Sequence, residues 1–194
     1  GYDFSLKGVP SFDAISGNKS ITSYKNAILA KNYFGILYLD YKDRYIFDGM
    51  VRYDGSSLFG ADARWNPYYR VSGAYRLSED LKLPGIQELK LRAAYGTAGQ
   101  RPGFADQYEV MQISGGNVSK LQLGNSKLKP SLSKEWEVGL NIDFLNRFSF
   151  EISRSETNTS DQIITVPLAV QYGGWPSQVQ NAGSLNSKVW EASL

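Results

Sequence analysis

Residues Asn32–Leu58, NYFGILYLDYKDRYIFDGMVRYDGSSL, contain two runs of alternating residues joined by a short polar turn at Lys42 and Asp43. Side chains in a strand alternate between its two faces with period two. The second run therefore presents one face with Tyr45, Phe47, Gly49, Val51 and Tyr53, and an opposite face with Arg44, Ile46, Asp48, Met50, Arg52 and Asp54. This pattern predicts a β-hairpin with an aromatic face and a charged face.

The charged face is too dense in charge for a soluble core, and the aromatic face has a tyrosine at each end. A soluble sheet buries its apolar face and exposes its polar face to water. A transmembrane barrel instead turns an apolar band with aromatic girdles toward lipid and keeps its lumen polar. The hairpin therefore favours a barrel, provided that the rest of the chain repeats the pattern.

The alternation recurs along the chain in runs near 69–77, 88–95, 135–144, 147–153 and 189–194. With the first hairpin these runs give about seven strands, each near the length that a tilted membrane strand needs. On this pattern we expect a lumen-facing set and a membrane-interface set of side chains. The lumen-facing set is Arg52, Arg70, Arg92, Glu135 and Glu137, and the interface set is Tyr45, Tyr53, Trp136 and Trp190.

Connection lengths support the same fold. Short links follow the first, third and fifth strands, and longer segments (54–67, 96–131 and 158–186) follow the others. Outer-membrane barrels have short periplasmic turns and long extracellular loops. An odd number of strands does not close a barrel of the usual even-stranded kind, and open sheet edges are not tolerated in lipid. We therefore predict an all-β, antiparallel transmembrane β-barrel segment that belongs to a larger barrel.

Composition excludes several kinds of chemistry. The chain of 194 residues has no cysteine and no histidine, and its formal net charge is +2. Disulfides, thiolate nucleophiles, Ser-His-Asp triads and the usual zinc sites are thereby excluded, and no cofactor, metal or nucleic acid is expected. No run approaches the ~20 apolar residues of a membrane helix. Residues 1–23 are expected to form a loop, and without a signal peptide we expect a mature protein or a piece of a longer one.

Four aromatic residues fall in the predicted external loops: Trp65, Tyr108, Tyr172 and Trp175. Such rings stack on sugars or pack against a partner, although packing within the loops is an equal alternative. Glu135 and Glu137 share a strand face, as paired carboxylates do in glycosidases, but a polar lumen explains them more simply. The arginines of the charged face are expected to pair with Asp48, Glu88 and similar acids across strands, or to hold a plug.

The blocks NYFGILYLDYKDRYIFDGMVRYDGSSLFG, RWNPYYRVSGAYRLSED and LKLRAAYGTAGQ closely resemble the central barrel region of SusC/RagA-family TonB-dependent outer-membrane transporters. The blocks LGNSKLKPSLSKEWEVGLNIDFLNRFSFEISRSETNTSDQII and NAGSLNSKVWEASL resemble its next hairpin and strand. The resemblance implies a plugged barrel of about 22 strands, in the outer membrane of a Bacteroidetes-like Gram-negative bacterium. It also implies import of oligosaccharides or oligopeptides with a SusD-like surface lipoprotein, driven by the TonB complex through the missing N-terminal region.

Three departures limit what these residues do alone, because a TonB box, a plug and the C-terminal strand are not recognisable in the sequence. The alternative from another class is a soluble extracellular β-sandwich that binds carbohydrate with the same aromatic residues. An enzyme is disfavoured by the absence of histidine and cysteine and of a coherent carboxylate site.

Overall fold

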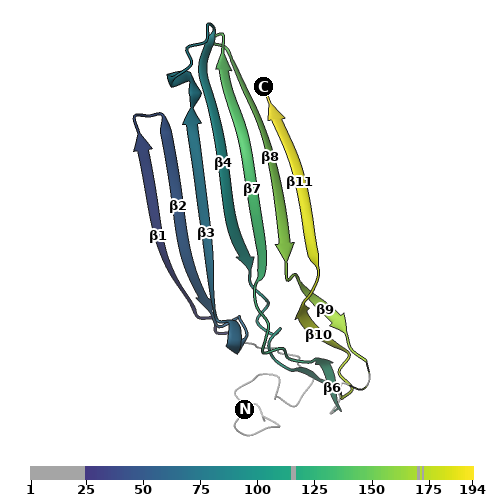
Figure 1. Ribbon diagram of the computed structural model, residues 1–194. Helices are drawn as coiled ribbons and strands as arrows, with labels where there is room; N and C mark the ends of the chain where they lie inside the picture. The colour runs from purple at the N-terminus through teal and green to yellow at the C-terminus, as the bar shows by residue number, and fades with distance from the viewer. Residues whose placement is uncertain (1–24, 115–116, 170, 172) are drawn as a thin grey trace, which may run out of the picture.

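A single antiparallel sheet of seven strands, in the order β1-β2-β3-β4-β7-β8-β11, makes up most of the computed structural model (Figure 1). The structure describes residues 25–194 except 115–116, 170 and 172, so the loop predicted for residues 1–23 lies outside the described residues. The strands are β1 (Ala30–Tyr41), β2 (Tyr45–Ser56), β3 (Trp65–Arg76), β4 (Ile86–Gln100), β7 (Ser131–Phe144), β8 (Phe148–Ser160) and β11 (Ser184–Ser193). The predicted all-β segment of about seven strands is confirmed.

Two small hairpins are additional to the prediction. β5 (Val110–Ser114) pairs with β6 (Asn117–Gln122), and β9 (Ile163–Pro167) pairs with β10 (Ser177–Asn181). Two short 3-10 helices, η2 (Ala61–Ala63) and η3 (Leu77–Glu79), lie in the connections after β2 and β3. Figure 1 shows both hairpins at the end of the sheet opposite the tight β1–β2 and β7–β8 turns. The long segments after β4 and β8 therefore build a folded layer at one end of the sheet.

The strands extend further toward that layer than the sequence pattern predicts. Asp54 pairs with Asn66 and Gly55 with Trp65, so the predicted external segment 54–67 shrinks to 57–64. That connection is no longer than the β3–β4 connection at 77–85, and the predicted alternation of loop lengths holds only for the later connections. The reason is that backbone pairing, which sets the strand ends, continues through turn-forming residues that lack apolar alternation.

The tight turns at the other end have two residues each in the left-handed region. Lys42 and Asp43 have φ of 58° and 51°, and Leu145 and Asn146 have φ of 55° and 54°. Arg44 N donates to Tyr41 O at 3.1 Å, and Arg147 N donates to Phe144 O at 3.3 Å. Positive φ at both central residues is the geometry of the two-residue turn that matches strand twist.

A leucine in this conformation carries a cost that asparagine largely avoids, since left-handed φ costs an ordinary L-residue about 1–2 kcal/mol. We expect Leu145→Asn to raise the stability of the intact transporter by about 0.5–1 kcal/mol. The measurement is the temperature at which the folded barrel loses its fast electrophoretic migration in detergent. Asn146→Leu is the converse change and should lower that temperature. An unchanged temperature in both variants would show that the turn is not strained.

The buried core lies under the connections rather than against the sheet. Phe59 and Leu128 are fully buried, and Leu58 and Tyr68 are nearly so. Gly60 N donates to Leu128 O at 2.7 Å, and Gln107 Nε2 donates to Ser57 O at 2.7 Å. The segments 57–64, 101–109 and 123–130 are therefore tied together at the end of the sheet that carries the two hairpins.

The aromatic face of the seven-stranded sheet is uncovered within the described residues. Its apolar side chains Leu37, Phe47, Val51, Tyr69, Val71, Leu91 and Val138 are all exposed. A contiguous exposed apolar surface of this extent requires a partner or lipid. The described residues provide no second sheet that packs on it, so the soluble-sandwich alternative does not match the architecture. Among these residues no helix is long and apolar enough to cross a bilayer.

Candidate functional site

Strand register divides the predicted residues into the two faces that the sequence indicates. Met50 pairs with Arg70, Arg70 with Gly96, and Gly96 with Glu135, so these positions share one face. Ala74 pairs with Arg92, and Ala94 pairs with Glu137, on that same face. The predicted lumen-facing residues Arg52, Arg70, Arg92, Glu135 and Glu137 therefore all lie on one side of the sheet, here named the charged face.

Arg92 is the centre of the largest polar group on the charged face. Its guanidinium donates to Glu137 on β7 and to Glu151 on β8, and its Nε donates to Asn141 Oδ1 at 3.3 Å. A Cβ built on Gly139, the residue opposite Arg92 in the ladder, would lie 2.5 Å from Arg92 Nε. Glycine therefore leaves the space through which one arginine on β4 reaches two carboxylates on two other strands.

Further ion pairs join neighbouring strands and the turn end. Arg70 binds Asp48, and Arg76 Nη2 lies 3.5 Å from Glu88 Oε2. Arg44 Nη1 lies 2.9 Å from Asp80 Oδ1, linking the β1–β2 turn to the β3–β4 connection. The prediction that the arginines pair with Asp48, Glu88 and similar acids is confirmed. Because these groups are partly exposed, each pair contributes only about 0–1 kcal/mol.

Charge is unevenly distributed across the charged face. β3 and β4 place four cationic residues there, Arg70, Arg76, Lys90 and Arg92, and one carboxylate, Glu88. On β7, β8 and β11, which are described throughout, the same face presents Glu135, Glu137, Asp143, Glu151 and Glu191 and no lysine or arginine. Arg92 offsets two of these acids, and Glu135 accepts a hydrogen bond of 2.6 Å from Thr157 Oγ1. Acidic side chains therefore predominate on the charged face along β7, β8 and β11.

The three predicted loop aromatic residues that the structure describes lie in three different settings. Trp65 begins β3 instead of lying in a loop, because the β2–β3 ladder continues to it. Tyr108 is half exposed and packs against Phe104, with ring centroids 5.8 Å apart. Trp175 is only 8% exposed, with Lys120 Nζ 5.2 Å from its ring centroid. Tyr172 lies outside the described residues, and the three described rings contact different neighbours.

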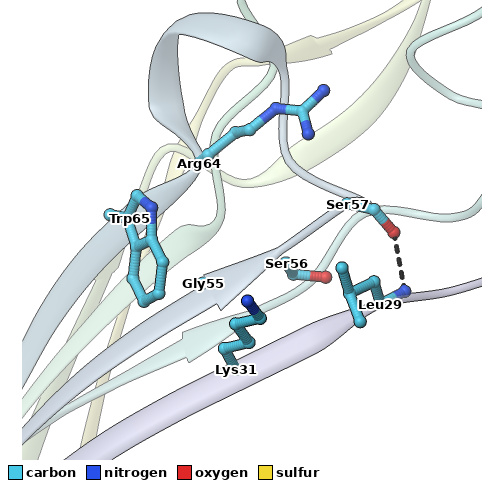
Figure 2. A pocket seen from close by; sticks show the side chains of 7 residues that line it. All are labelled: Leu29, Lys31, Gly55, Ser56, Ser57, Arg64 and Trp65. Carbon is cyan, nitrogen blue, oxygen red and sulfur yellow. Dashed lines mark hydrogen bonds between the residues drawn. The ribbon is translucent and has the colours of Figure 1, made fainter.

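Trp65 forms one wall of a hollow of about 170 Å³ at the start of β1, the end of β2 and the start of β3 (Figure 2). Leu29, Lys31, Gly55, Ser56, Ser57 and Arg64 line the rest. The Trp65 ring stacks on Tyr53 and on Tyr33, with centroids 5.2 Å and 5.8 Å apart. It lies directly over Gly55, where a Cβ would come within 2.7 Å of the ring. Trp65 thus belongs to an aromatic cluster on the face opposite the charged one.

The predicted interface residues also lie on this aromatic face. Tyr45 stacks on Tyr75 at the turn end, with centroids 4.9 Å apart, and Tyr53 joins the Trp65 cluster at the other end. Trp136 pairs with Tyr95 in the ladder, and Trp190 pairs with Arg154. Sequence analysis did not single out Arg154, whose guanidinium carbon lies 5.9 Å from the Trp136 ring centroid and 4.9 Å from that of Trp190. Only the strand register reveals this contact, since the two tryptophans are far apart in sequence.

The described residues contain no group of three acidic, histidine or cysteine side chains placed to hold a metal ion. The paired glutamates do not form a glycosidase site either, since Arg92 binds Glu137 and Thr157 binds Glu135. What the geometry defines is a sheet with an aromatic, lipid-compatible face and a polar, ion-paired face. That combination is the wall of a transmembrane β-barrel.

Comparison with known proteins gives the family. The profile described as TonB dependent receptor-like, beta-barrel matches residues 1–194, and the chain belongs to this family of outer-membrane transporters of Gram-negative bacteria. It is 31% identical over 192 residues to a TonB-dependent receptor of Formosa agariphila, covering 90% of this chain and 19% of that protein. It is 28% identical over 190 residues to the TonB-dependent receptor SusC of Bacteroides thetaiotaomicron, covering 89% of this chain and 19% of SusC.

Solved structures show the same fold. The RagAB peptide transporter superposes with a TM-score of 0.78 and 24% identity, covering 89% of this chain and 20% of that chain. The siderophore receptor PirA of Pseudomonas aeruginosa superposes with a TM-score of 0.61 and 13% identity, covering 85% of this chain and 30% of that one. The chain therefore spans about a fifth of the length of its curated relatives. The predicted SusC/RagA-type barrel segment in the outer membrane is confirmed, and the family consists of transporters rather than enzymes.

Proposed function

We propose that the protein containing this segment imports oligosaccharides or oligopeptides across the outer membrane, powered through TonB, with a SusD-like surface lipoprotein as its partner. The observation that carries the proposal is the match of the whole chain to the barrel of SusC/RagA-type receptors. RagAB is a peptide transporter, which supports peptide cargo and a RagB-like second component. The similarity to SusC supports the assignment of this protein to the same type of transporter.

In this proposal the two ends of the segment have different tasks. The layer made from 101–130 and 161–183 faces the cell exterior, where cargo and lipoprotein arrive. The charged face lines the lumen and contacts a plug and passing cargo through Arg52, Arg70, Arg92, Glu135 and Glu137. Of the predicted external aromatic residues, Tyr108 has the exposed ring that a stacking contact requires, whereas the burial of Trp175 supports packing within the layer.

The test is purification of the tagged full-length protein from the detergent-solubilised outer membrane, with intact mass and co-purifying proteins measured together. We expect a mass several times 21.6 kDa and a surface lipoprotein in the same complex. A strain lacking the gene should lose growth on one oligosaccharide or peptide mixture as the sole nutrient. A free 21.6 kDa species in the soluble fraction would overturn the proposal.

A further inference from the structure

A basic group interrupts the aromatic face where β7, β8 and β11 approach the external layer. Lys134, Arg154 and Lys188 lie on this face, because Lys134 pairs with Asn158, Arg154 with Val138, and Lys188 with Glu156. Together with Trp136 and Trp190 they form what we name the basic belt. Three cations on the lipid-facing side of a barrel wall need an explanation, since the outward surface of a barrel is apolar over most of its height.

Two of the three cations in the basic belt have no described carboxylate beside them that offsets their charge. Glu156 is the one carboxylate on this face of the three strands, all of which are described. It lies 3.8 Å from Lys188 Nζ and accepts a hydrogen bond of 2.9 Å from Asn186 Nδ2. Within the described residues, Lys134 and Arg154 have no carboxylate oxygen within ion-pair distance. The basic belt therefore carries a net positive charge on the lipid-facing side of the sheet.

The depth of the basic belt can be read from the ladder. Phe144 stacks on Phe148 at the turn end, with ring centroids 5.4 Å apart. Trp136 and Glu156, which pair with each other, lie eight positions further along β7 and β8. At about 3.3 Å per residue and a tilt near 40°, eight positions span about 20 Å. Arg154 lies six positions from Phe148, at about 15 Å, and Lys134 lies ten positions from Phe144, at about 25 Å. Since the apolar band of a barrel is about 25 Å tall, the basic belt occupies the outer part of that band, with Lys134 at headgroup level and Arg154 about 10 Å below it.

The two tryptophans hold Arg154 in the outer part of the apolar band, below Lys134. Its guanidinium lies over both indole rings, within the ~6 Å range of a cation–π contact. The rings cover the apolar part of the side chain and leave the charge directed toward the interface, as long basic side chains do near membrane surfaces. The strands thus supply one ordered cation between two interface anchors, with Lys134 and Lys188 in the rows beyond it.

We propose that the basic belt binds the phosphate group of an anionic lipid in the outer leaflet, with Arg154 as the central contact. A phosphate matches the fork of donors on the guanidinium, and the flanking ammonium groups complement its remaining charge. The indole rings pack against the upper acyl chains. The lipid is a docking partner on the outside of the wall, independent of the cargo in the lumen. Each basic side chain near such a surface contributes about fivefold in affinity.

The experiment uses the full-length transporter, purified in mild detergent and titrated with monophosphoryl lipid A or with the same lipid after removal of its phosphate. Native mass spectrometry reports the fraction of protein that retains the lipid. We expect the phosphorylated lipid to bind in preference, and Arg154→Gln to weaken its binding about fivefold. Arg154→Lys keeps the charge but not the fork of donors, so it should retain more lipid than Arg154→Gln and less than the unchanged protein. Arg147→Gln, which removes an exposed cation at the turn end of β8, is the matched control and should leave binding unchanged.

Three outcomes would overturn the proposal. Equal retention of the dephosphorylated lipid would show that phosphate is not recognised, and an equal loss in Arg147→Gln would show that only overall charge matters. Displacement of the lipid by inorganic phosphate at millimolar concentration would assign the basic belt to a free anion. If Arg154→Gln fails to fold, as judged by heat-modifiable migration, Lys134→Gln is the second variant, because Lys134 is exposed. It should weaken retention several-fold without affecting the fold.

Discussion

Replacing Leu128 by alanine is expected to open the folded layer at the end of the sheet and to expose the segment 101–130 to protease. Leu128 is fully buried, in contact with the segment that holds Phe59, and its backbone accepts the 2.7 Å hydrogen bond from Gly60 N. Truncating a buried leucine costs about 2–5 kcal/mol, according to how far the surroundings collapse. Cleavage of a locally opened segment follows the population of the open form. The rate should therefore rise by at least about 30-fold.

The measurement is limited proteolysis of the intact transporter in detergent, with the cut sites identified by mass spectrometry. Leu121→Ala in β6 is the matched control, since it removes the same atoms from a side chain that is 42% exposed. That control should change the rate by less than about threefold, because exposed positions rarely shift stability by more than about 0.5 kcal/mol. Equal acceleration in both variants would mean that Leu128 does not hold the layer together.

Gly60→Ala tests the same junction from the opposite side. A Cβ at Gly60 would lie 2.8 Å from the backbone nitrogen of Leu128 and closer still to the Ser126 carbonyl. Backbone atoms cannot move aside as a flexible side chain can, so the two segments must separate. Faster cleavage in this variant, with Leu128 still present, would show that the contact between segments and not the leucine alone is required.

The membrane-spanning part of the fold can be read from the sequence because period-two alternation survives in each strand. Register places Tyr45, Tyr53, Trp136 and Trp190 on one face, as the alternation predicts. A barrel wall imposes this pattern, since one side of every strand meets lipid and the other meets water. In this region the fold can therefore be predicted from the residue types along each strand.

The folded layer at the end of the sheet could not be predicted in the same way. β5, β6, β9 and β10 have five or six residues each, and β9 pairs with β10 across a connection rich in glycine. Leu128 gives no signal of burial, because it lies between two lysines in a polar segment. Its burial depends on Phe59 and Gly60, more than sixty residues earlier. Long-range packing of this kind leaves no local periodicity.

The contact of Arg154 with both tryptophans was missed for a related reason. Sequence alternation places Arg154 on the lipid-facing side, where an arginine contradicts the expected apolar pattern. Trp136 and Trp190 come beside it only through the β7–β8 and β8–β11 registers. A single residue that breaks an otherwise regular pattern is the signal that could have directed attention there, because such exceptions concentrate at functional positions.

Arg92→Met is expected to be the most destabilising change on the charged face, lowering the stability of the intact barrel by about 1–3 kcal/mol. The guanidinium binds Glu137 and Glu151, which lie on adjacent strands. Methionine keeps much of the side-chain volume but leaves the two carboxylates facing each other without a cation. The estimate stays below that for a fully buried pair because the Arg92 side chain is 32% exposed.

The readout is the temperature or urea concentration at which the purified transporter loses its folded migration in detergent. Lys90→Met is the matched control on the same face of β4, since its ammonium lies 3.7 Å from Glu88 Oε1 and that acid also meets Arg76. It should cost less than about 0.5 kcal/mol. If the two variants lose the same stability, the contact of Arg92 with β7 and β8 stabilises the sheet no more than an ordinary surface ion pair does.

Compensation separates lost charge from lost packing. Adding Glu137→Gln and Glu151→Gln to Arg92→Met removes the repulsion, so the triple variant should recover most of the lost stability. Gly139→Val is the complementary test. The Cβ of the new valine would lie 2.5 Å from Arg92 Nε. The valine would therefore displace the guanidinium while every charge stays present. A loss in Gly139→Val together with recovery in the triple variant would show that stability depends on the position of the charge and not on its mere presence. The guanidinium of Arg92 would then stabilise the sheet by its fixed position between Glu137 and Glu151.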